Sequence, residues 1–285
     1  MPVRRIAGRK VFLTIILFLG VNGVGQAAAK QNSIFWFKDL EKASEAAQKT
    51  NQPMMIDFWA DWCAPCKLMD AEVYGNPAVI SSVGRKIVAV RIHFDLQPEM
   101  VRKFNVTALP YLVFTNSYGT ELLHHSGMLE ADDLTALVNA FPDDVAELNR
   151  LDRILQEDKN HFEGLLAMGR ELRAAEFFAS SNDYYERAVK QSDARKNPAR
   201  RESILFEMGW NSLELQDGKT ATSTFERCLK EFPESERKPE ILLGLGRAHV
   251  LSDRKEKARR LLNSLIAQYP QSEASIKART LLNSL

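Results

Sequence analysis

Two cysteines with two residues between them carry the clearest chemistry in this sequence. Cys63 and Cys66 lie in the segment WCAPCK (residues 62–67), one residue after the mainly apolar run 54–60. That run predicts a buried strand, and Pro65 is typical of the first turn of a helix. A thiol at a helix N-terminus ionises below the ~8.5 of free cysteine, because unpaired backbone amides favour the thiolate. The spacing indicates a redox pair in which Cys63 attacks a disulfide and Cys66 resolves the mixed disulfide.

A zinc site and a permanent staple are the two alternatives for this pair. Zinc takes four ligands, usually completed by a second cysteine or histidine pair at matching spacing. The third cysteine is Cys228, and the adjacent His124 and His125 would face opposite sides of a strand. A disulfide that spans only two residues would be strained and easily reduced. Redox chemistry is therefore favoured, and we expect neither a metal nor another cofactor.

Residues 57–67 (DFWADWCAPCK) resemble the active-site segment of the thioredoxin family, most closely the C-terminal thioredoxin-like domain of the periplasmic disulfide reductase DsbD. Residues 108–114 resemble the family's cis-proline strand, with Pro110 at the cis position. Residues 72–79 resemble the helix continuation of the DsbD-like group, and Gly127 stands where the family has a glycine after its last strand. The resemblance covers about residues 34–141. Ala64 replaces the glycine of ordinary thioredoxins, so the family's redox potential does not carry over.

The resemblance also implies roles for residues around the cysteine pair. Asp57 would lie beneath the pair and relay protons to and from Cys66, since burial would raise its pKa toward the working range. A carboxylate satisfied by a nearby lysine or by turn amides is the alternative. The backbone before Pro110 would pair with a substrate strand, unless Pro110 is only an edge or turn proline. The residues expected to contact substrate are Trp62, Ala64, Pro65, Leu109 and Pro110.

Trp59 and Trp62 have two readings, as ordinary core or surface aromatics or as part of the site. We expect Trp62 to shield the cysteine pair.

The pattern of residues 34–141 alternates strands with helices. Expected strands are 34–37, 54–59, 86–94, 111–115 and 121–125, and expected helices are 40–49, 98–104 and 130–140. Asn116-Ser117-Tyr118-Gly119 predicts a hairpin between the last two strands. Together these elements predict an α/β thioredoxin-like domain.

The sequence changes character after Pro142, where long helical patterns replace the aromatic runs. Gly209, Ala221, Phe225 and Pro233 recur 37 positions later as Gly246, Ala258, Leu262 and Pro270. A weaker copy without the proline is Gly169, Ser181, Tyr185 and Ala188. These intervals resemble the tetratricopeptide repeat, in which small residues let two helices approach and a large apolar residue fills the groove. The long period predicts longer turns than usual.

We therefore expect an all-α array of three tetratricopeptide units, with a connecting helix at 143–159 and a capping helix at 272–285. Stacked helix pairs of this kind form a concave face that binds peptides or proteins. The alternative is a helical bundle that only stabilises the first domain. Cys228 falls on one helix face with Phe225 and Leu229, which indicates a buried small hydrophobe.

The N-terminus predicts the compartment. Four basic residues (Arg4, Arg5, Arg9 and Lys10), an apolar run at 11–20 and an Ala-x-Ala site at 27–29 are the three parts of a secretory signal peptide. The apolar run is short for a span of about 20 residues, although an uncleaved membrane anchor is the alternative. We expect an exported protein, in a bacterial periplasm. The expected domains are a signal peptide (1–29), a thioredoxin-like domain (30–142) and a helical repeat domain (143–285).

The composition is ordinary, with a net charge of +1, which argues against nucleic-acid or acidic-membrane partners. The sequence predicts an exported thiol–disulfide oxidoreductase that reduces protein disulfides. Its partners would be protein disulfide or dithiol substrates, an electron donor or acceptor protein, and a protein bound by the repeats. An interaction scaffold that uses the thioredoxin-like domain only as a binding module is the alternative. The joint presence of Cys63, Cys66, Asp57 and Pro110 favours the enzyme.

Overall fold

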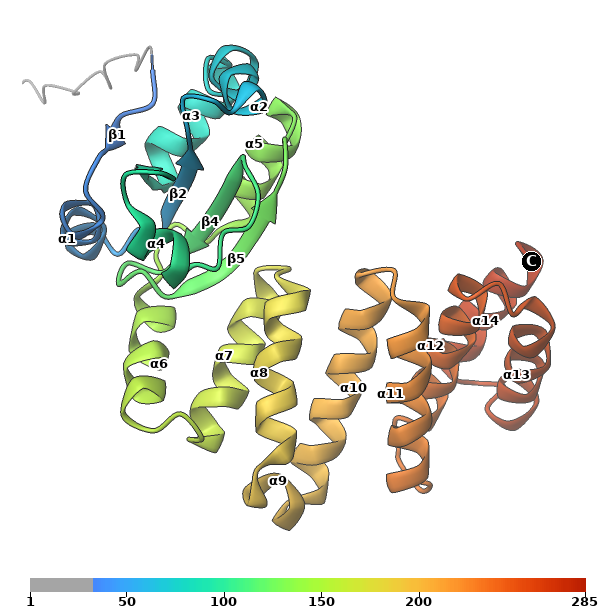
Figure 1. The fold of residues 1–285 in the computed structure, drawn as a ribbon. Coiled ribbons are helices and arrows are strands. Elements are labelled where there is room, and N and C mark those ends of the chain that lie inside the picture. Colours follow the sequence, from blue (N-terminus) through green and yellow to red (C-terminus); the bar gives the residue numbers. More distant parts are fainter. Residues whose placement is uncertain (1–32) are drawn as a thin grey trace, which may run out of the picture. The chain divides into compact units, whose positions relative to one another are not determined.

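The structure of this chain is a computed structural model that describes residues 33–285 (Figure 1). The predicted signal peptide lies outside these residues. No helix within 33–285 combines the length and the apolar character needed to cross a membrane. Residues 33–285 form one compact unit, which begins with a five-stranded sheet and continues as a series of helices.

The sheet is mixed and has the strand order β1-β3-β2-β4-β5. Its strands are β1 (Trp36–Phe37), β2 (Met54–Trp59), β3 (Val88–His93), β4 (Tyr111–Thr115) and β5 (Glu121–Ser126). Strand β2 is central, parallel to β3 and antiparallel to β4. Its side chains alternate between the two faces, so Met55 and Asp57 share one face while Ile56 and Phe58 share the other. The predicted α/β class is confirmed, and strand bounds differ from the sequence expectation by at most two residues.

Helices cover both faces of the sheet. The helical elements of this part are α1 (Leu40–Thr50), α2 (Ala64–Leu68), the π-turn η1 (Met69–Val73), α3 (Pro77–Lys86), α4 (Pro98–Lys103) and α5 (Ala131–Ala140). Ile56 and Phe58 pack in a core with α1, whereas Met55 packs in a core with α3 and α5. One expectation is wrong: residues 72–79 do not continue a helix. The chain turns at Tyr74–Asn76, because the Asn76 side chain caps a new helix at the Ala78 amide.

The second part is entirely helical, as the sequence predicts. Its helices are α6 (Ala146–Glu157), α7 (Phe162–Ala174), α8 (Phe178–Lys190), α9 (Ser192–Lys196), α10 (Pro198–Glu214), α11 (Gly218–Glu231), α12 (Lys238–Leu251), α13 (Lys255–Gln268) and α14 (Glu273–Asn283). Three helix pairs, α7/α8, α10/α11 and α12/α13, form the repeat units. The short helix α9 was not expected, and it lengthens the connection between the first two pairs.

The repeated glycines explain why the pairs pack closely. A Cβ atom on Gly169 would lie 2.5 Å from the Tyr185 ring, and one on Gly209 would lie 2.5 Å from the Phe225 ring. The third unit uses Gly246 against Leu262 at the same 2.5 Å. Such approaches are closer than van der Waals contact allows, so each site admits only glycine without a shift. The pattern found in the sequence is therefore a set of helix-packing contacts.

The sheet and the helical array share one core. The rings of Phe114 on β4 and Phe141 stack with their centroids 5.2 Å apart, and Phe141 in turn lies 4.3 Å from Phe177 before α8. Apolar contacts continue from this cluster through α6, α7 and α10 as far as α12. The predicted domain boundary at 142/143 thus falls inside a continuous hydrophobic core.

Candidate redox site

The Cys63–Cys66 pair forms a disulfide at the start of α2, with Cα atoms 5.3 Å apart. Cys63 is the N-cap of this helix, and its Sγ accepts a hydrogen bond from the Cys66 amide at 3.2 Å. Pro65 lies in the first turn, where its missing N–H leaves no intrahelical bond unmade. Both sulfur-bearing residues are buried in this oxidised state. The helix start therefore provides an amide donor aimed at the sulfur that the sequence marks as the nucleophile.

The loop before β4 lies against the cysteine pair. The Leu109–Pro110 peptide bond is cis, and Leu109 packs against the small cluster formed by Ala60, Cys63 and Cys66. The carbonyl of Pro110 accepts a 2.9 Å hydrogen bond from the amide of Gly127, which has a positive φ of 100°. Pro110 is buried, whereas Ala64 and Pro65 are exposed.

Trp62 is the most exposed aromatic side chain at this end of the sheet, at 63% of its possible surface. Its Nε1 donates a 2.8 Å hydrogen bond to Asp95 Oδ2. Its ring meets Phe94 edge-on at 6.0 Å, and Phe94 packs against the cysteine cluster. Trp62 thus offers an open apolar surface next to the pair, and its shielding role stays a prediction.

Asp57 is buried in the centre of the sheet, with 1% of its surface exposed. Arg91 stands directly across from it in the β2–β3 register, and Arg91 Nε donates a 2.9 Å hydrogen bond to Asp57 Oδ2. Burial raises the pKa of Asp57 from 3.8 to about 6, although the positive charge of Arg91 opposes this rise. An arginine, not the lysine or turn amides of the alternative reading, therefore partners this carboxylate. The proton-relay role of Asp57 stays a prediction.

Three residues of this cluster were missed from the sequence: Arg91, Asp70 and Tyr74. Arg91 also forms an ion pair of 2.6 Å with Asp70 on η1, and its guanidinium lies 5.5 Å from the centre of the Tyr74 ring. Arg91 is the one permanent charge in an otherwise mostly apolar strand. That interruption was a usable signal, because an arginine inside a sheet needs a buried acid nearby.

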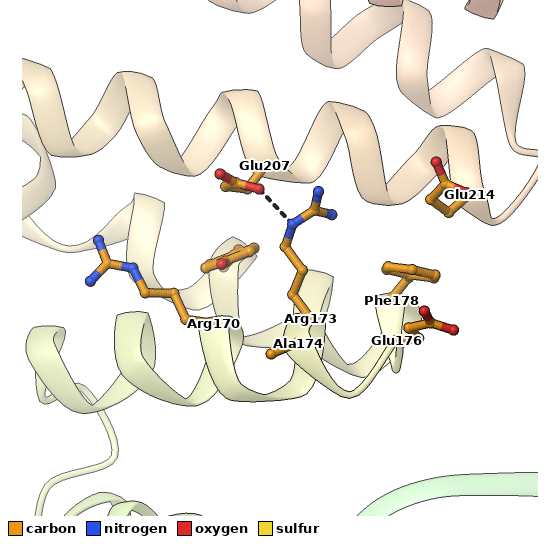
Figure 2. A pocket seen from close by; sticks show the side chains of 8 residues that line it. Arg170, Arg173, Ala174, Glu176, Phe178, Glu207 and Glu214 are labelled. Carbon is orange, nitrogen blue, oxygen red and sulfur yellow. Dashed lines mark ion pairs between the residues drawn. The ribbon is translucent and has the colours of Figure 1, made fainter. Parts of the chain in front are cut away.

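The helical array carries a second candidate site, a groove across α7 and α10 (Figure 2). A cavity of about 620 Å³ is lined by Arg170, Arg173, Ala174, Glu176, Phe178, Tyr185, Glu207 and Glu214. Figure 2 shows Arg173 reaching from α7 toward Glu207 on α10, an ion pair of 2.6 Å. Most of the side chains that line this cavity are charged.

A further cavity of about 510 Å³ lies between α10, α12 and α14. The main lining residues are Trp210, Leu243, Arg247, Lys277 and Leu281. Glu207 and Glu214 line the first cavity and Trp210 lines the second, and their spacing places all three on one face of α10. Both cavities therefore border the same helix. The ring of Trp210 carries the Arg247 guanidinium at 5.3 Å, and the buried Nε1 of Trp210 has no hydrogen-bond partner among residues 33–285.

Comparison with known sequences agrees with both halves of this description. Residues 40–142 match the thioredoxin-like domain family, and residues 212–282 match the tetratricopeptide repeat. The chain therefore contains a thioredoxin-like domain followed by tetratricopeptide repeats, which confirms the resemblance drawn from the motifs.

Among curated relatives, the chain is 29% identical to the thiol:disulfide interchange protein DsbD of Campylobacter jejuni (strain RM1221) over 130 residues, 45% of this chain and 22% of DsbD. It is 36% identical to Thioredoxin 1 of Chlorobaculum tepidum over 75 residues, 26% of this chain and 65% of that thioredoxin. The chain thus spans about a fifth of DsbD. A solved structure titled DsbH Oxidoreductase is 20% identical, with a TM-score of 0.32, and the match covers 38% of this chain and 83% of that one.

Proposed function

We propose that this chain is an exported thiol–disulfide oxidoreductase that reduces protein disulfides through Cys63 and Cys66. One observation carries the proposal: the disulfide at the start of α2, with the Cys66 amide donating to Cys63 Sγ at 3.2 Å. A thiolate at Cys63 would accept the same hydrogen bond and would be stabilised by the partial positive charge at the start of the helix. Cys63 is therefore the better nucleophile of the two cysteines. The name of one relative, the thiol:disulfide interchange protein DsbD, supports the same chemistry.

The reaction begins with the reduced pair. The Cys63 thiolate attacks one sulfur of a client disulfide, and the other client sulfur leaves as a thiolate. Cys66 loses its proton to Asp57 and attacks the Cys63 sulfur of the mixed disulfide. The client leaves with both sulfurs reduced, two electrons richer, and the Cys63–Cys66 disulfide is formed. A donor dithiol protein must then reduce this disulfide to start another cycle.

The surface around the pair supplies the docking contacts in this proposal. Exposed Ala64 and Pro65 leave room for a client chain beside the cysteines, and Trp62 provides an apolar contact. Leu109 and Pro110 would offer the backbone of their loop to an extended client segment, in the manner of strand addition.

The helical repeats would bind a client or partner protein, and the lining of the two cavities supports this role. Charged groups at Arg170, Glu176 and Glu214 and the half-buried indole of Trp210 are chemically suited to a polypeptide surface. The basic and apolar N-terminal pattern supports export to a periplasm, with an uncleaved anchor as the variant form.

The full-length protein, reduced and assayed with insulin and dithiothreitol, tests the function. We expect Cys63→Ser and Cys66→Ser to lose the acceleration of insulin reduction, while Cys228→Ser keeps it. Cys66→Ser should also retain clients as mixed disulfides on Cys63. Parental insulin reduction by the Cys63→Ser variant would contradict the proposal.

A further inference from the structure

His93 is the last residue of β3, and its imidazole ring contacts two loops at the cysteine end of the sheet. Its Nδ1 accepts a 3.3 Å hydrogen bond from the amide of Asp95, and its Nε2 lies 3.3 Å from Asp61 Oδ2. Trp59, its partner in the β2–β3 register, meets the imidazole edge-on at 4.9 Å. The His93 side chain is only 14% exposed, so these contacts fix the orientation of the ring.

The two ring nitrogens of His93 depend differently on the charge of the ring. A backbone amide is always a hydrogen-bond donor, so Nδ1 accepts from Asp95 only while it carries no proton. The single proton of the neutral ring then lies on Nε2, where it faces the Asp61 carboxylate. Asp61 is 86% exposed, so this second contact is weak. The bond between Nδ1 and the Asp95 amide is therefore the one that requires a neutral ring.

Asp95 also holds Trp62, whose Nε1 donates a 2.8 Å hydrogen bond to Asp95 Oδ2. The turn that carries Asp95 is closed by a 3.1 Å bond from the Gln97 amide to the His93 carbonyl. Apart from its edge-on contact with Phe94, the indole of Trp62 is open to solvent, with 63% of its surface exposed. The amide and the carboxylate of Asp95 thus connect the imidazole of His93 to this indole.

A proton on Nδ1 breaks the connection. Imidazole takes up its second proton between about pH 5 and 8 in ordinary surroundings. The protonated Nδ1 of His93 no longer accepts from the Asp95 amide, and it becomes a second donor that competes with the indole for the Asp95 carboxylate. The charged groups around the ring are Asp61 and Asp95 from the two loops and Arg91 on β3, whose guanidinium lies 5.2 Å from the Trp59 ring. Proton uptake therefore costs the indole part of its anchor.

We propose that His93 is a positioning residue for client docking: its neutral ring holds the Asp95 turn, and through this turn Trp62, in place beside the cysteine pair, and a proton on Nδ1 releases Trp62. The inference rests on the proposed function, in which Trp62 contacts the client. It adds His93 and Asp95 to the site, and both act through Trp62. Docking should therefore weaken as the pH falls through the titration of His93.

The first measurement is an NMR pH titration of the full chain in its oxidised form, which follows the imidazole of His93 and the indole N–H of Trp62. We expect the Trp62 resonance to shift with the same midpoint as His93. The second measurement is single-turnover reduction of insulin by the reduced protein, with the insulin concentration varied to separate docking from the chemical step. The half-saturating insulin concentration should rise about fivefold on the acid side of the midpoint, which corresponds to one hydrogen bond.

Two variants separate the ring nitrogens of His93. In His93→Asn, the side-chain oxygen can accept from the Asp95 amide as Nδ1 does, and it does not titrate. This variant should keep the Trp62 resonance and the docking of the neutral parent at every pH, so the ratio of parent to variant removes pH effects that belong to insulin. His93→Gln reaches toward Asp61 as Nε2 does and leaves the Asp95 amide without its acceptor. It should dock insulin above the midpoint as weakly as the parent does below it.

His125→Asn is the matched control, because His125 is a half-buried histidine on β5 whose Nε2 contacts the Met128 carbonyl, and it should keep the parental pH dependence. A Trp62 resonance that does not follow the His93 midpoint would overturn the proposal. Equal docking by folded His93→Asn and His93→Gln would overturn it as well, because a merely structural histidine would affect both variants alike. Failure of the proposed function would appear separately, as parental insulin reduction by Cys63→Ser.

Discussion

Asn116 and Asp152 join the sheet to the helical array through a buried hydrogen bond. Asn116 Nδ2, in the β4–β5 turn, donates to Asp152 Oδ2 on α6 at 3.0 Å. The same oxygen accepts from Thr120 Oγ1 at 2.8 Å and from Gln156 Nε2 at 2.9 Å. A buried carboxylate with three donors is stable only while the donors remain in place. Helix α6 therefore belongs structurally to the hairpin as well as to the repeats.

A fragment that ends after Pro142 should be less stable than one that ends after Lys159. The shorter fragment loses α6, and with it the Asp152 bonds and the cover over Phe141. Each lost buried hydrogen bond costs about 1 kcal/mol, so the difference should exceed about 2 kcal/mol. Urea unfolding of the two fragments measures it. Equal urea midpoints for the two fragments would mean that α6 adds no stability to the sheet and that the first domain ends at 142/143.

Asp57→Asn should stabilise the oxidised protein at pH 8 but not at pH 4. The pKa of Asp57 is raised by burial from 3.8 to about 6, so the folded chain holds this proton more tightly than the unfolded chain. The protonated carboxyl of Asp57 therefore adds its full contribution to the unfolding free energy below about pH 4. That contribution is lost as the pH rises from about 4 through about 6. About two pKa units correspond to at most ~3 kcal/mol.

Denaturant unfolding at both pH values gives this difference, with Asp61→Asn as the control because the Asp61 side chain is 86% exposed. Equal stabilisation at pH 4 and pH 8 would mean that Asp57 is not the titrating group.

Gly209→Ala should destabilise the array in spite of the better helix propensity of alanine. The added Cβ would lie 2.5 Å from the Phe225 ring, and overpacking of this kind costs about 1–3 kcal/mol. Gly164→Ala is the comparison, since its nearest atoms would be 3.2 Å away. Thermal unfolding compares the two, and Phe225→Leu in the Gly209→Ala background should recover part of the loss. Equal melting temperatures for the two alanine variants would refute the packing account.

Cys63 in the reduced protein should be alkylated with an apparent pKa below the ~8.5 of free cysteine, because the start of α2 stabilises its thiolate. Iodoacetamide rates across pH, measured on Cys66→Ser, isolate this thiol. Cys228 should not react in the folded chain, because burial raises its pKa to about 12. An apparent pKa for Cys63 at or above that of free cysteine would rule out activation by the helix.

The sequence was a good guide to features that depend on neighbours along the chain. The cysteine pair, the strands and the glycine–aromatic spacing of the repeats are all local patterns, and each is found in the structure. Arg91 was missed because its partnership with Asp57 depends on the β2–β3 register, which no local pattern specifies. The turn at Tyr74–Asn76 was missed although Asn76 and Pro77 form a local helix-start signal. The short helix α9 depends on its packing against α8 and α10, which no local pattern specifies. The shared core around Phe141 could not be seen from either half alone.

Burial of Cys228 bears on which cysteines of this chain can pair. Three cysteines allow three different pairings in an unfolded chain, and in the structure only Cys63 and Cys66 are joined. Cys228 is completely covered on α11, with Phe225 one turn away on the same helix. With none of its surface exposed, this residue cannot meet a disulfide on another molecule while the chain is folded. The packing around α11 thus keeps the third cysteine of the folded chain away from the Cys63–Cys66 disulfide.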